Sequence, residues 1–319
     1  MTGAERRGVL LMTYGSPASL EREDIGAYLM RVRGGREPDA ELVDEFTRRY
    51  GVIGGSPLIE ITRAQAAALG RVLGWPVEAG MRFSAPSITD GLRALADGGV
   101  EQVAAITLSP QYSALLMGGY AKAIEEGRAV LGDLAPKVSV AGAWHDEPAF
   151  VTALANRITA VLDRISSDER DTLAVLMTAH SLPKRVAEQE PGYLTQLRDT
   201  AEAVADRAGI PRDRWQFCWQ SAGHEPGEWM KPDFEDLMPQ LAAAGRRSVL
   251  VTPVQFLADH LEILYDVDIG AREQAERCGL RFHRIESLNV DRGLTDALAA
   301  VARKTVETDQ SLGMAAKRS

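Results

Sequence analysis

The sequence predicts an α/β fold with two related halves, each a four-stranded parallel sheet flanked by helices. Short apolar runs alternate along the chain with longer amphipathic stretches, which is typical of β/α units. Most of the short runs are apolar at nearly every position, as expected for parallel strands covered on both faces. Similar sequences recur at corresponding strand ends of the two halves, which indicates an internal repeat.

Eight strands are expected, four in each half. In chain order they are 8–12, 77–83, 103–108, 138–144, 172–178, 215–220, 248–252 and 280–285. Amphipathic patterns predict helices in the gaps between them, for example at 25–31, 61–73, 148–164, 193–208 and 294–306. Turn residues such as Gly74-Trp75-Pro76 and Gly209-Ile210-Pro211 separate helix ends from the strands that follow.

The repeat is visible at two pairs of strand ends. The third strand ends in Leu108-Ser109-Pro110-Gln111-Tyr112 and the seventh in Val251-Thr252-Pro253-Val254-Gln255-Phe256. The first and fifth strands run into turns closed by proline, Thr13-Tyr14-Gly15-Ser16-Pro17 and Thr178-Ala179-His180-Ser181-Leu182-Pro183. Because both similarities fall at corresponding strands, they predict an N-terminal lobe over 1–145 and a C-terminal lobe over 146–290.

The two halves differ between their first two strands. The N-terminal half is longer there by about 30 residues, which is long for a βα connection. This difference predicts a helical insertion at about 18–58. Ligands of open α/β sheets bind beyond the C-terminal ends of the strands, where the insertion starts, so we expect it to form one wall of a cleft between the halves.

Composition excludes several classes of protein. The 319 residues include 36 Lys and Arg against 45 Asp and Glu, a net charge of −9, which argues against a general nucleic-acid binder. Apolar runs fall short of the roughly 20 residues of a spanning helix, and the charged N-terminus does not resemble a signal peptide. The two cysteines, Cys218 and Cys278, lack the spacing of a zinc or iron–sulfur site. We therefore expect a soluble cytoplasmic protein. We also expect the side chain of Cys218 to point into the core beside the neighbouring tryptophans.

The residues with the clearest chemistry are a histidine and two carboxylates. His180 is expected at a strand's C-terminal end, where imidazole serves as a metal ligand or base, or as a loop residue bonded to backbone. Glu262 and Asp266 are four apart, on one face of a helix expected to open at 259–268. Alternatively, these two carboxylates belong to an acidic first helical turn that complements the helix dipole and binds no metal. Together the residues predict a His/carboxylate site for a labile divalent ion such as Fe²⁺.

Two further features point to a flat or anionic ligand. Tyr14 ends the first strand and is the counterpart of His180, so the two would approach a flat ligand from opposite sides if the halves face each other. Its alternative is a Tyr that caps the sheet. The loop from Gly51 to Pro57 follows Arg48-Arg49-Tyr50 and suits a carboxylate or phosphate, or is an ordinary turn. It lacks the end of a Walker loop, and no G-x-G-x-x-G follows the first strand.

At this point the sequence resembles the ferrochelatase family over nearly the whole chain. The motifs that carry the resemblance are Leu11-Met12-Thr13-Tyr14-Gly15-Ser16-Pro17, Tyr50 through Gly54-Gly55-Ser56-Pro57-Leu58, Ser109-Pro110-Gln111-Tyr112-Ser113, Thr178-Ala179-His180-Ser181-Leu182-Pro183, Trp219-Gln220-Ser221-Ala222-Gly223 and Asp259-His260-Leu261-Glu262. Each is weak alone, and their order along the chain makes the resemblance specific. It implies two Rossmann-like lobes with a porphyrin cleft between them, and a C-terminal helix within 291–319 that packs back on the first lobe before a short polar tail.

The resemblance also implies an activity, that of a lyase inserting Fe²⁺ into a porphyrin in haem biosynthesis. The stretch from Trp219 through Pro226 to Trp229 is most similar to the soluble Gram-positive-type branch, whose substrate is coproporphyrin III. Fe²⁺ is then a substrate, with no permanently bound cofactor and no iron–sulfur cluster. We expect a cytoplasmic monomer without a nucleic-acid or membrane partner.

The family's site carries over onto matching positions. His180 and Glu262 match the metal-centre residues, and Asp266 continues from Glu262 toward a possible outer metal site. The matching porphyrin-binding positions are Tyr14, Arg33, Arg49, Tyr50, Ser56 and Tyr120. Gly270 stands where relatives often have another carboxylate, and Gly34 where some have a second Arg. We expect His180 to accept a pyrrole proton while Glu262 binds metal or relays protons, although both residues are also suited to ligate Fe²⁺.

Three other readings remain open at this point. One is a ferrochelatase that acts on protoporphyrin IX and gives protohaem. Another is a porphyrin or haem carrier without activity, which has no need of Glu262. The third is a cobalt chelatase for a corrinoid precursor, but such enzymes usually have a His-rich metal site and this chain has 5 scattered histidines.

Overall fold

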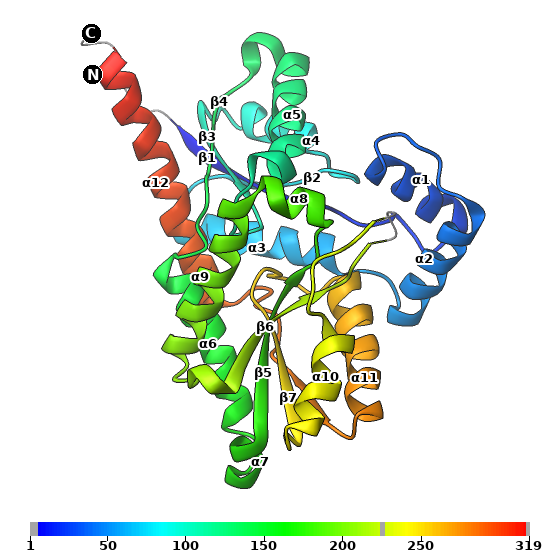
Figure 1. Ribbon diagram of the computed structural model, residues 1–319. Helices are drawn as coiled ribbons and strands as arrows, with labels where there is room; N and C mark the ends of the chain where they lie inside the picture. Colours follow the sequence, from blue (N-terminus) through cyan, green and yellow to red (C-terminus); the bar gives the residue numbers. More distant parts are fainter. Residues whose placement is uncertain (1–5, 224–226, 317–319) are drawn as a thin grey trace. The chain divides into compact units, whose positions relative to one another are not determined.

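A computed structural model describes residues 6–223 and 227–316 (Figure 1). The chain divides into two compact units. The first unit consists of Met1–Trp144 and Asn289–Ser319, and the second of His145–Leu288. Each unit contains a four-stranded parallel sheet, as the sequence predicts.

The sheet of the first unit has the order β2-β1-β3-β4. Its strands are β1 (Arg7–Thr13), β2 (Val77–Met81), β3 (Gln102–Thr107) and β4 (Lys137–Val140). Leu10 and Met12 of β1 pack with Leu92 and Ile124 of the helices on one face. Because side chains alternate across a strand, Val9 and Leu11, also fully buried, point to the opposite face.

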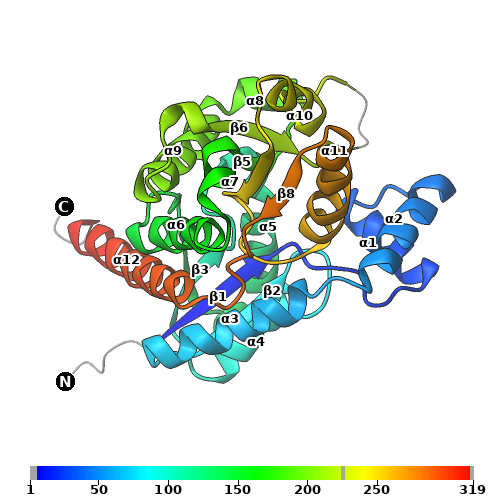
Figure 2. The ribbon, with the colours of Figure 1, turned by 90° about the horizontal axis from the view of Figure 1, so that it is seen from below.

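Helices flank the first sheet, with α3, α4 and α12 in contact with its strands. The helices of the first unit are α1 (Arg22–Val32), α2 (Ala40–Ile53), α3 (Leu58–Leu73), α4 (Ile88–Asp97), α5 (Ala114–Leu131), the short η1 (Gly132–Leu134) and α12 (Arg292–Ala316). α4 and α5 pack together on one side, and α12 packs against α3, β3 and β4 (Figure 2). α1 and α2 pack against each other and are the two helices that the expected insertion adds before α3.

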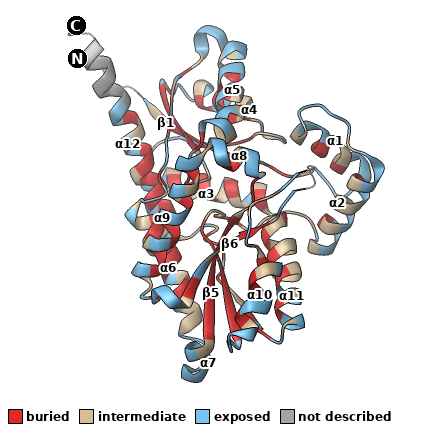
Figure 3. Ribbon diagram, in the orientation of Figure 1, coloured by how far each residue is buried: buried red, intermediate tan, exposed pale blue. Residues whose placement is uncertain are grey.

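The second unit repeats this topology with the order β6-β5-β7-β8. Its elements are α6 (Pro148–Leu162), α7 (Ser167–Thr172), β5 (Leu173–His180), α8 (Lys184–Gln189), α9 (Pro191–Arg207), η2 (Arg212–Arg214), β6 (Trp215–Gln220), α10 (Phe234–Ala243), β7 (Ser248–Pro253), the π-helix η3 (Glu262–Ala271), α11 (Arg272–Arg277) and β8 (Arg281–Arg284). β5 is buried over nearly its whole length (Figure 3), as expected for a strand covered on both faces. The sequence-based prediction of two related halves is confirmed.

All eight predicted strands exist, and two of them end more than one residue earlier than predicted. The strand predicted to reach Trp144 ends at Val140, where its pairing with β3 also ends. The indole of Trp144 then turns inward, and its Nε1 donates to the carbonyl of Thr107 at 3.4 Å. The strand predicted to reach Phe83 ends at Met81.

The helix after β7 differs from the prediction in both its start and its type. It was expected to open at Asp259, but the helical segment starts at Leu261 and the π-helix spans Glu262–Ala271. Asp259 and His260 precede it, and the His260 carbonyl accepts the first helical hydrogen bond, from Leu264 at 2.9 Å. π-Helical turns are rare and occur frequently at functional sites.

Two further observations concern membranes and cysteines. No helix in the part of the chain that the structure describes is long and apolar enough to cross a membrane. Both cysteines are free, and Cys218 of β6 is fully buried in the core cluster of the second unit, as predicted. Burial raises the pKa of its thiol well above the usual value, and the nearby Asp233 and Asp236 raise it further.

Candidate functional site

His180 is the last residue of β5, and both its backbone and its ring are fixed. Its N–H donates to Oε1 of Gln255 at 2.8 Å, just beyond the end of β7. Its ring Nδ1 lies 2.5 Å from the carbonyl oxygen of Ser181. A carbonyl oxygen only accepts, so Nδ1 carries the proton of the neutral ring, and Nε2 keeps its lone pair free for a proton or a metal.

Glu262 opens the π-helix and faces that lone pair. Its Oε2 lies 3.7 Å from Nε2 of His180. Within 6–223 and 227–316 this oxygen is buried and has no hydrogen-bond partner. Two acceptors thus face each other without a proton donor between them, an arrangement that a shared proton or a bound cation would satisfy. The structure therefore brings the two predicted metal-centre residues together, because β5 and β7 are neighbours in the sheet.

Aromatic rings border the His180–Glu262 pair. The ring centroids of Trp229 and Phe256 lie 6.4 Å and 6.5 Å from that of His180. Trp229 packs directly over Gly223, where an added Cβ would lie 2.8 Å from the indole. Apolar neighbours lower the local dielectric constant, which strengthens any interaction of Glu262 with a cation.

Gln255 is a residue of this site that the sequence analysis did not single out. Its Nε2 donates to the hydroxyl of Tyr193 at 2.5 Å while its Oε1 accepts from His180. Tyr193 lies on α9, and its burial raises the pKa of its hydroxyl. One available signal was the repeat, which places Gln111 and Gln255 after corresponding strands.

In the first unit, Tyr14 and Tyr120 lie near an arginine that the sequence analysis also missed. Tyr14 follows β1, is 43% exposed, and meets the ring of Phe83 edge-on at 4.6 Å. The guanidinium of Arg82 lies over the rings of Phe83 and Tyr120, 4.6 Å and 5.4 Å from their centroids. Tyr120 is buried on α5, and burial, reinforced by Tyr14, raises the pKa of its hydroxyl.

The position of Arg82 depends on a glycine. A Cβ at Gly119 of α5 would lie 1.8 Å from the Arg82 guanidinium, so any side chain there would displace the cation. Sequence patterns alone give no sign of this contact. The exposed Tyr14 ring and the adjacent cation form a surface suited to an aromatic, anionic ligand.

Of the two predicted carboxylate-binding arginines, Arg49 has an internal partner. Its Nε donates to Oε1 of Glu45 at 2.7 Å, on the same helix α2. Hydrogen bonds from Arg48 and Arg49 lower the pKa of Glu45 to about 2, so this carboxylate stays ionised at neutral pH. Arg33 caps α1, and among the described residues its buried Nε has no hydrogen-bond partner.

Tyr50 and Ser56 lie near the loop between α2 and α3. Tyr50 is buried, with its ring 6.4 Å from that of Phe46. Gly54 ends α2 in the left-handed conformation with φ 74°, which glycine adopts without strain. The predicted turn between helices is thus present, and the hydroxyl of Ser56 accepts from the N–H of Leu58 at 3.4 Å.

Asp266 and Gly270 lie further along the π-helix. Asp266 is partly exposed, and Gly270 adds no carboxylate. No group of three or more His, Cys, Asp or Glu side chains arranged to hold a metal is found among the residues that the structure describes. Pro226, part of the motif similar to the Gram-positive-type branch, lies outside the described residues.

Comparison with solved structures shows the fold. SirB from Bacillus subtilis, solved with Fe³⁺, matches with a TM-score of 0.59 at 11% identity, over 96% of this chain and 98% of that chain. CbiX, described as the terminal enzyme for biosynthesis of sirohaem in denitrifying bacteria, matches with a TM-score of 0.52 at 14% identity, over 94% and 99%. At these identities the likeness shows the fold alone, which is that of chelatases.

Comparison of sequences shows the family. A ferrochelatase of Deinococcus radiodurans is 38% identical over 316 residues, covering 96% of this chain and 98% of its own. A coproporphyrin III ferrochelatase of Geobacillus thermodenitrificans is 36% identical over 306 residues, covering 93% and 95%. The profile of the ferrochelatase family matches residues 6–306. With these matches over nearly its whole length, the chain belongs to the ferrochelatase family.

Proposed function

We propose that this protein inserts Fe²⁺ into coproporphyrin III, with His180 and Glu262 at the metal centre. Insertion of iron into a porphyrin, a step of haem biosynthesis, is the activity of the family to which the chain belongs. The observation that carries the site assignment is the pairing of Nε2 of His180 with Oε2 of Glu262 at 3.7 Å, the latter buried and without a hydrogen-bond partner among the described residues.

Iron insertion must remove two pyrrole protons and strip water from the metal. His180 suits the proton transfer, because the bond from Nδ1 to the Ser181 carbonyl leaves Nε2 as the accepting atom. Glu262 suits the metal, because an ionised carboxylate with an unpartnered oxygen gains most from a cation. In this division of roles, Glu262 guides Fe²⁺ while His180 takes one of the two pyrrole protons and the other passes to water. The Glu262 carboxylate stabilises the imidazolium that forms.

The first unit is suited to hold the macrocycle by its carboxylates. Arg33 caps α1 and has a buried Nε without a hydrogen-bond partner among the described residues, and Arg82 lies beside the rings of Tyr120 and Phe83. Such contacts are remote from the reacting nitrogens, so their binding energy serves to orient the ring and to favour a distorted, metal-accepting shape. Arg49 would have to share its charge between Glu45 and a propionate.

The choice of coproporphyrin III rests on relatives. Several matching proteins carry that substrate in their name, among them the Geobacillus thermodenitrificans protein at 36% identity. Coproporphyrin III has four propionates where protoporphyrin IX has two, so it presents two more carboxylates that arginine side chains can bind. The insertion of the first unit contains five arginines between 31 and 49, namely Arg31, Arg33, Arg36, Arg48 and Arg49.

The deciding experiment is anaerobic Fe²⁺ insertion measured with coproporphyrin III and protoporphyrin IX under identical conditions. We expect a higher kcat/KM with coproporphyrin III. A preference for protoporphyrin IX would keep the reaction and reject the substrate. Binding of both porphyrins without metallation would indicate a carrier, and the roles given to His180 and Glu262 would then be wrong.

The catalytic roles are tested by replacing each residue with alanine. His180→Ala and Glu262→Ala are each expected to lower kcat by about 10²–10⁴-fold, the range for a lost acid–base group. Porphyrin affinity, measured by fluorescence quenching, should stay near that of the unmodified protein. Undiminished turnover in both variants would refute the assignment.

We also infer that the protein acts as a monomer in the cytoplasm. Its two cysteines are free, as is usual in a reducing compartment. Light scattering during size-exclusion chromatography tests the monomer directly. A mass of twice the 34.6 kDa of the chain would refute it.

A further inference from the structure

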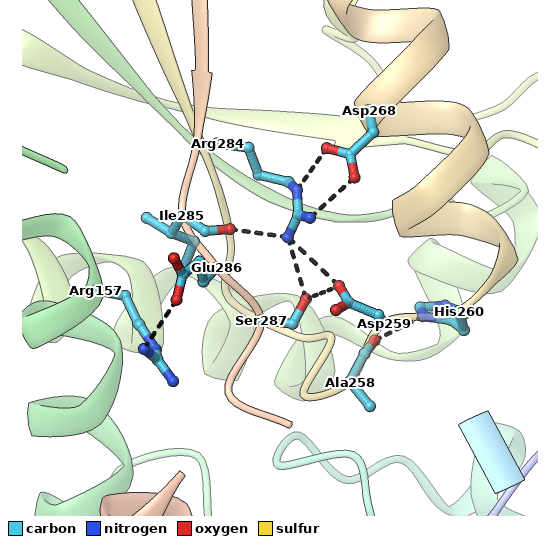
Figure 4. A network of polar contacts seen from close by, with 9 residues as sticks. All are labelled: Arg157, Ala258, Asp259, His260, Asp268, Arg284, Ile285, Glu286 and Ser287. Atoms are coloured by element: carbon cyan, nitrogen blue, oxygen red, sulfur yellow. Dashed lines mark hydrogen bonds and ion pairs between the residues drawn. The ribbon is translucent and has the colours of Figure 1, made fainter. Parts of the chain in front are cut away.

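We propose that Arg284 is a positioning residue for iron insertion, which holds the segment around Glu262 so that its carboxylate faces His180. The inference rests on the metal-centre role proposed above for these two residues. Arg284 is the last residue of β8, the edge strand beside β7. Figure 4 shows how its guanidinium reaches two separate segments of the second unit.

The strongest contact of Arg284 is with the π-helix. Its Nε and one terminal nitrogen donate to the two carboxylate oxygens of Asp268 at 2.7 Å and 2.9 Å. Both side chains are largely buried, with 14% of Arg284 and 26% of Asp268 exposed. A two-pronged contact of this kind fixes orientation as well as distance, so it restrains rotation of the π-helix.

The other terminal nitrogen of Arg284 holds the residues before the helix. It lies 3.5 Å from a carboxylate oxygen of Asp259 and donates to the carbonyl of Ile285 at 2.9 Å. It also lies 3.3 Å from the hydroxyl of Ser287, which itself donates to Asp259 at 2.7 Å. One guanidinium therefore joins β8, the π-helix and the segment that leads into the π-helix.

These contacts flank Glu262 in the sequence. Asp259 precedes it by three positions and Asp268 follows it by six. The buried Oε2 of Glu262 has no hydrogen-bond partner among the residues that the structure describes, so this oxygen would gain by turning toward water. A restraint on both sides of the residue opposes that movement. Arg284 supplies it without touching Glu262.

The same connecting segment is tied to His180 at its other end. Gln255, which follows β7, accepts from the His180 N–H at 2.8 Å. The segment from Gln255 to Glu262 is thus fixed to β5 through Gln255 and to β8 through Asp259. The 3.7 Å separation between Nε2 of His180 and Oε2 of Glu262 depends on both attachments.

Charge gives Arg284 a second effect. Four carboxylates lie between 259 and 268, namely Asp259, Glu262, Asp266 and Asp268. The guanidinium contacts two of them and so reduces their repulsion of Glu262. Arg272 contacts only the backbone carbonyl of Asp268, at 2.9 Å, and its guanidinium lies over the ring of Phe282.

β8 also provides a matched control. Arg281, at the start of the same strand, pairs with Glu169, a carboxylate whose side chain is only 10% exposed. Removing this guanidinium also leaves a buried acid without one of its partners, but at the opposite end of the strand from Arg284. Arg281→Gln therefore removes an arginine–carboxylate pair from the same strand without removing a contact to the segments that flank Glu262.

The experiment compares steady-state kinetics of the full chain for Arg284→Gln, Arg284→Lys, Arg281→Gln and Glu262→Gln, below the melting temperature of each. Arg284→Gln is expected to lower kcat about 10–100-fold and to raise KM for Fe²⁺, as for other groups that orient metal ligands. KM for porphyrin should change by less than about twofold, because the porphyrin contacts lie elsewhere. Arg284→Lys keeps the positive charge but loses the two-pronged contact with Asp268, so its kcat should lie between those of the unmodified protein and Arg284→Gln. Arg281→Gln should keep the kcat of the unmodified protein.

Asp268→Asn provides the answer if Arg284→Gln does not fold. It keeps the shape of the acceptor, removes the charge, and should lower kcat in the same direction. The inference is overturned if the Arg284 or Asp268 variant loses no more kcat than Arg281→Gln, or if the loss appears only in KM for porphyrin. A fully active Glu262→Gln would refute the proposed metal centre as well, whereas an inactive Glu262→Gln beside a fully active Arg284→Gln would refute the positioning role alone.

Discussion

Replacement of Gln255 by leucine tests whether the support behind His180 contributes to both stability and turnover. The Gln255 amide accepts from the His180 N–H at 2.8 Å and donates to the Tyr193 hydroxyl at 2.5 Å. Leucine has a similar size but no polar atoms, so it removes both bonds without opening a large cavity. Tyr193 is only 2% exposed, and water cannot readily replace its lost partner.

The expected loss of stability follows from these two unpaired groups. A buried polar group without a partner costs about 1–3 kcal/mol, and the His180 N–H is less deeply buried than the Tyr193 hydroxyl. Gln255→Leu should therefore destabilise the second unit by about 2–4 kcal/mol. Turnover should also fall, because the end of β5 that carries the His180 imidazole loses its tie to the end of β7.

A double-mutant cycle with Tyr193→Phe separates this reasoning from a general packing defect. Tyr193→Phe alone leaves the Gln255 amide N–H unpaired, whereas the double variant leaves only the His180 N–H unpaired. The two changes should therefore be less harmful together than their sum, by about 1 kcal/mol. Urea unfolding followed by fluorescence and by circular dichroism measures these values and checks that both probes report one transition. Additive losses, or a Gln255→Leu variant as stable as the unmodified protein, would refute the reasoning.

Three further outcomes are expected. Burial alone would raise the pKa of Glu169, but hydrogen bonds from His283 and Arg281 lower that pKa below its usual value. The carboxylate therefore stabilises the fold above the pKa of an unfolded Glu and loses this effect as pH falls through its lowered pKa; Glu169→Gln should flatten the acid limb of stability against pH. Gly223→Val should displace Trp229 from beside the proposed metal-centre residue His180 and lower kcat, because even a Cβ there lies 2.8 Å from the indole, and unchanged kinetics would contradict this contact. Cys218 should resist thiol reagents in the native protein and react only on unfolding, since burial raises its pKa, and rapid native labelling would show otherwise.

The sequence by itself determined the architecture of each unit. Continuous apolar runs predicted parallel strands, and the recurrence of Pro and Gln after corresponding strands predicted two units of the same topology. It also predicted His180 and Glu262 as site residues, because His180 follows one apolar strand and Glu262 lies four residues from Asp266 on the helix after another. These conclusions depend on the spacing of apolar residues along a short stretch of chain, and that spacing can be read directly from the sequence.

Tertiary structure alone decided how those residues are held. The π-helix was predicted as an ordinary helix starting at Asp259, because a change from i→i+4 to i→i+5 bonding leaves little trace in hydrophobic spacing. Gln255 is 75 residues from His180 in sequence, and Arg284 is 16 from Asp268. The pairing of Arg49 with Glu45 could have been predicted from the sequence, since the two residues lie four apart on one helix. Sequence analysis instead assigned Arg49 to a propionate of the ligand. Bonds between distant residues depend on the direction and reach of side chains after packing, and a periodic pattern in one stretch of chain does not contain that information.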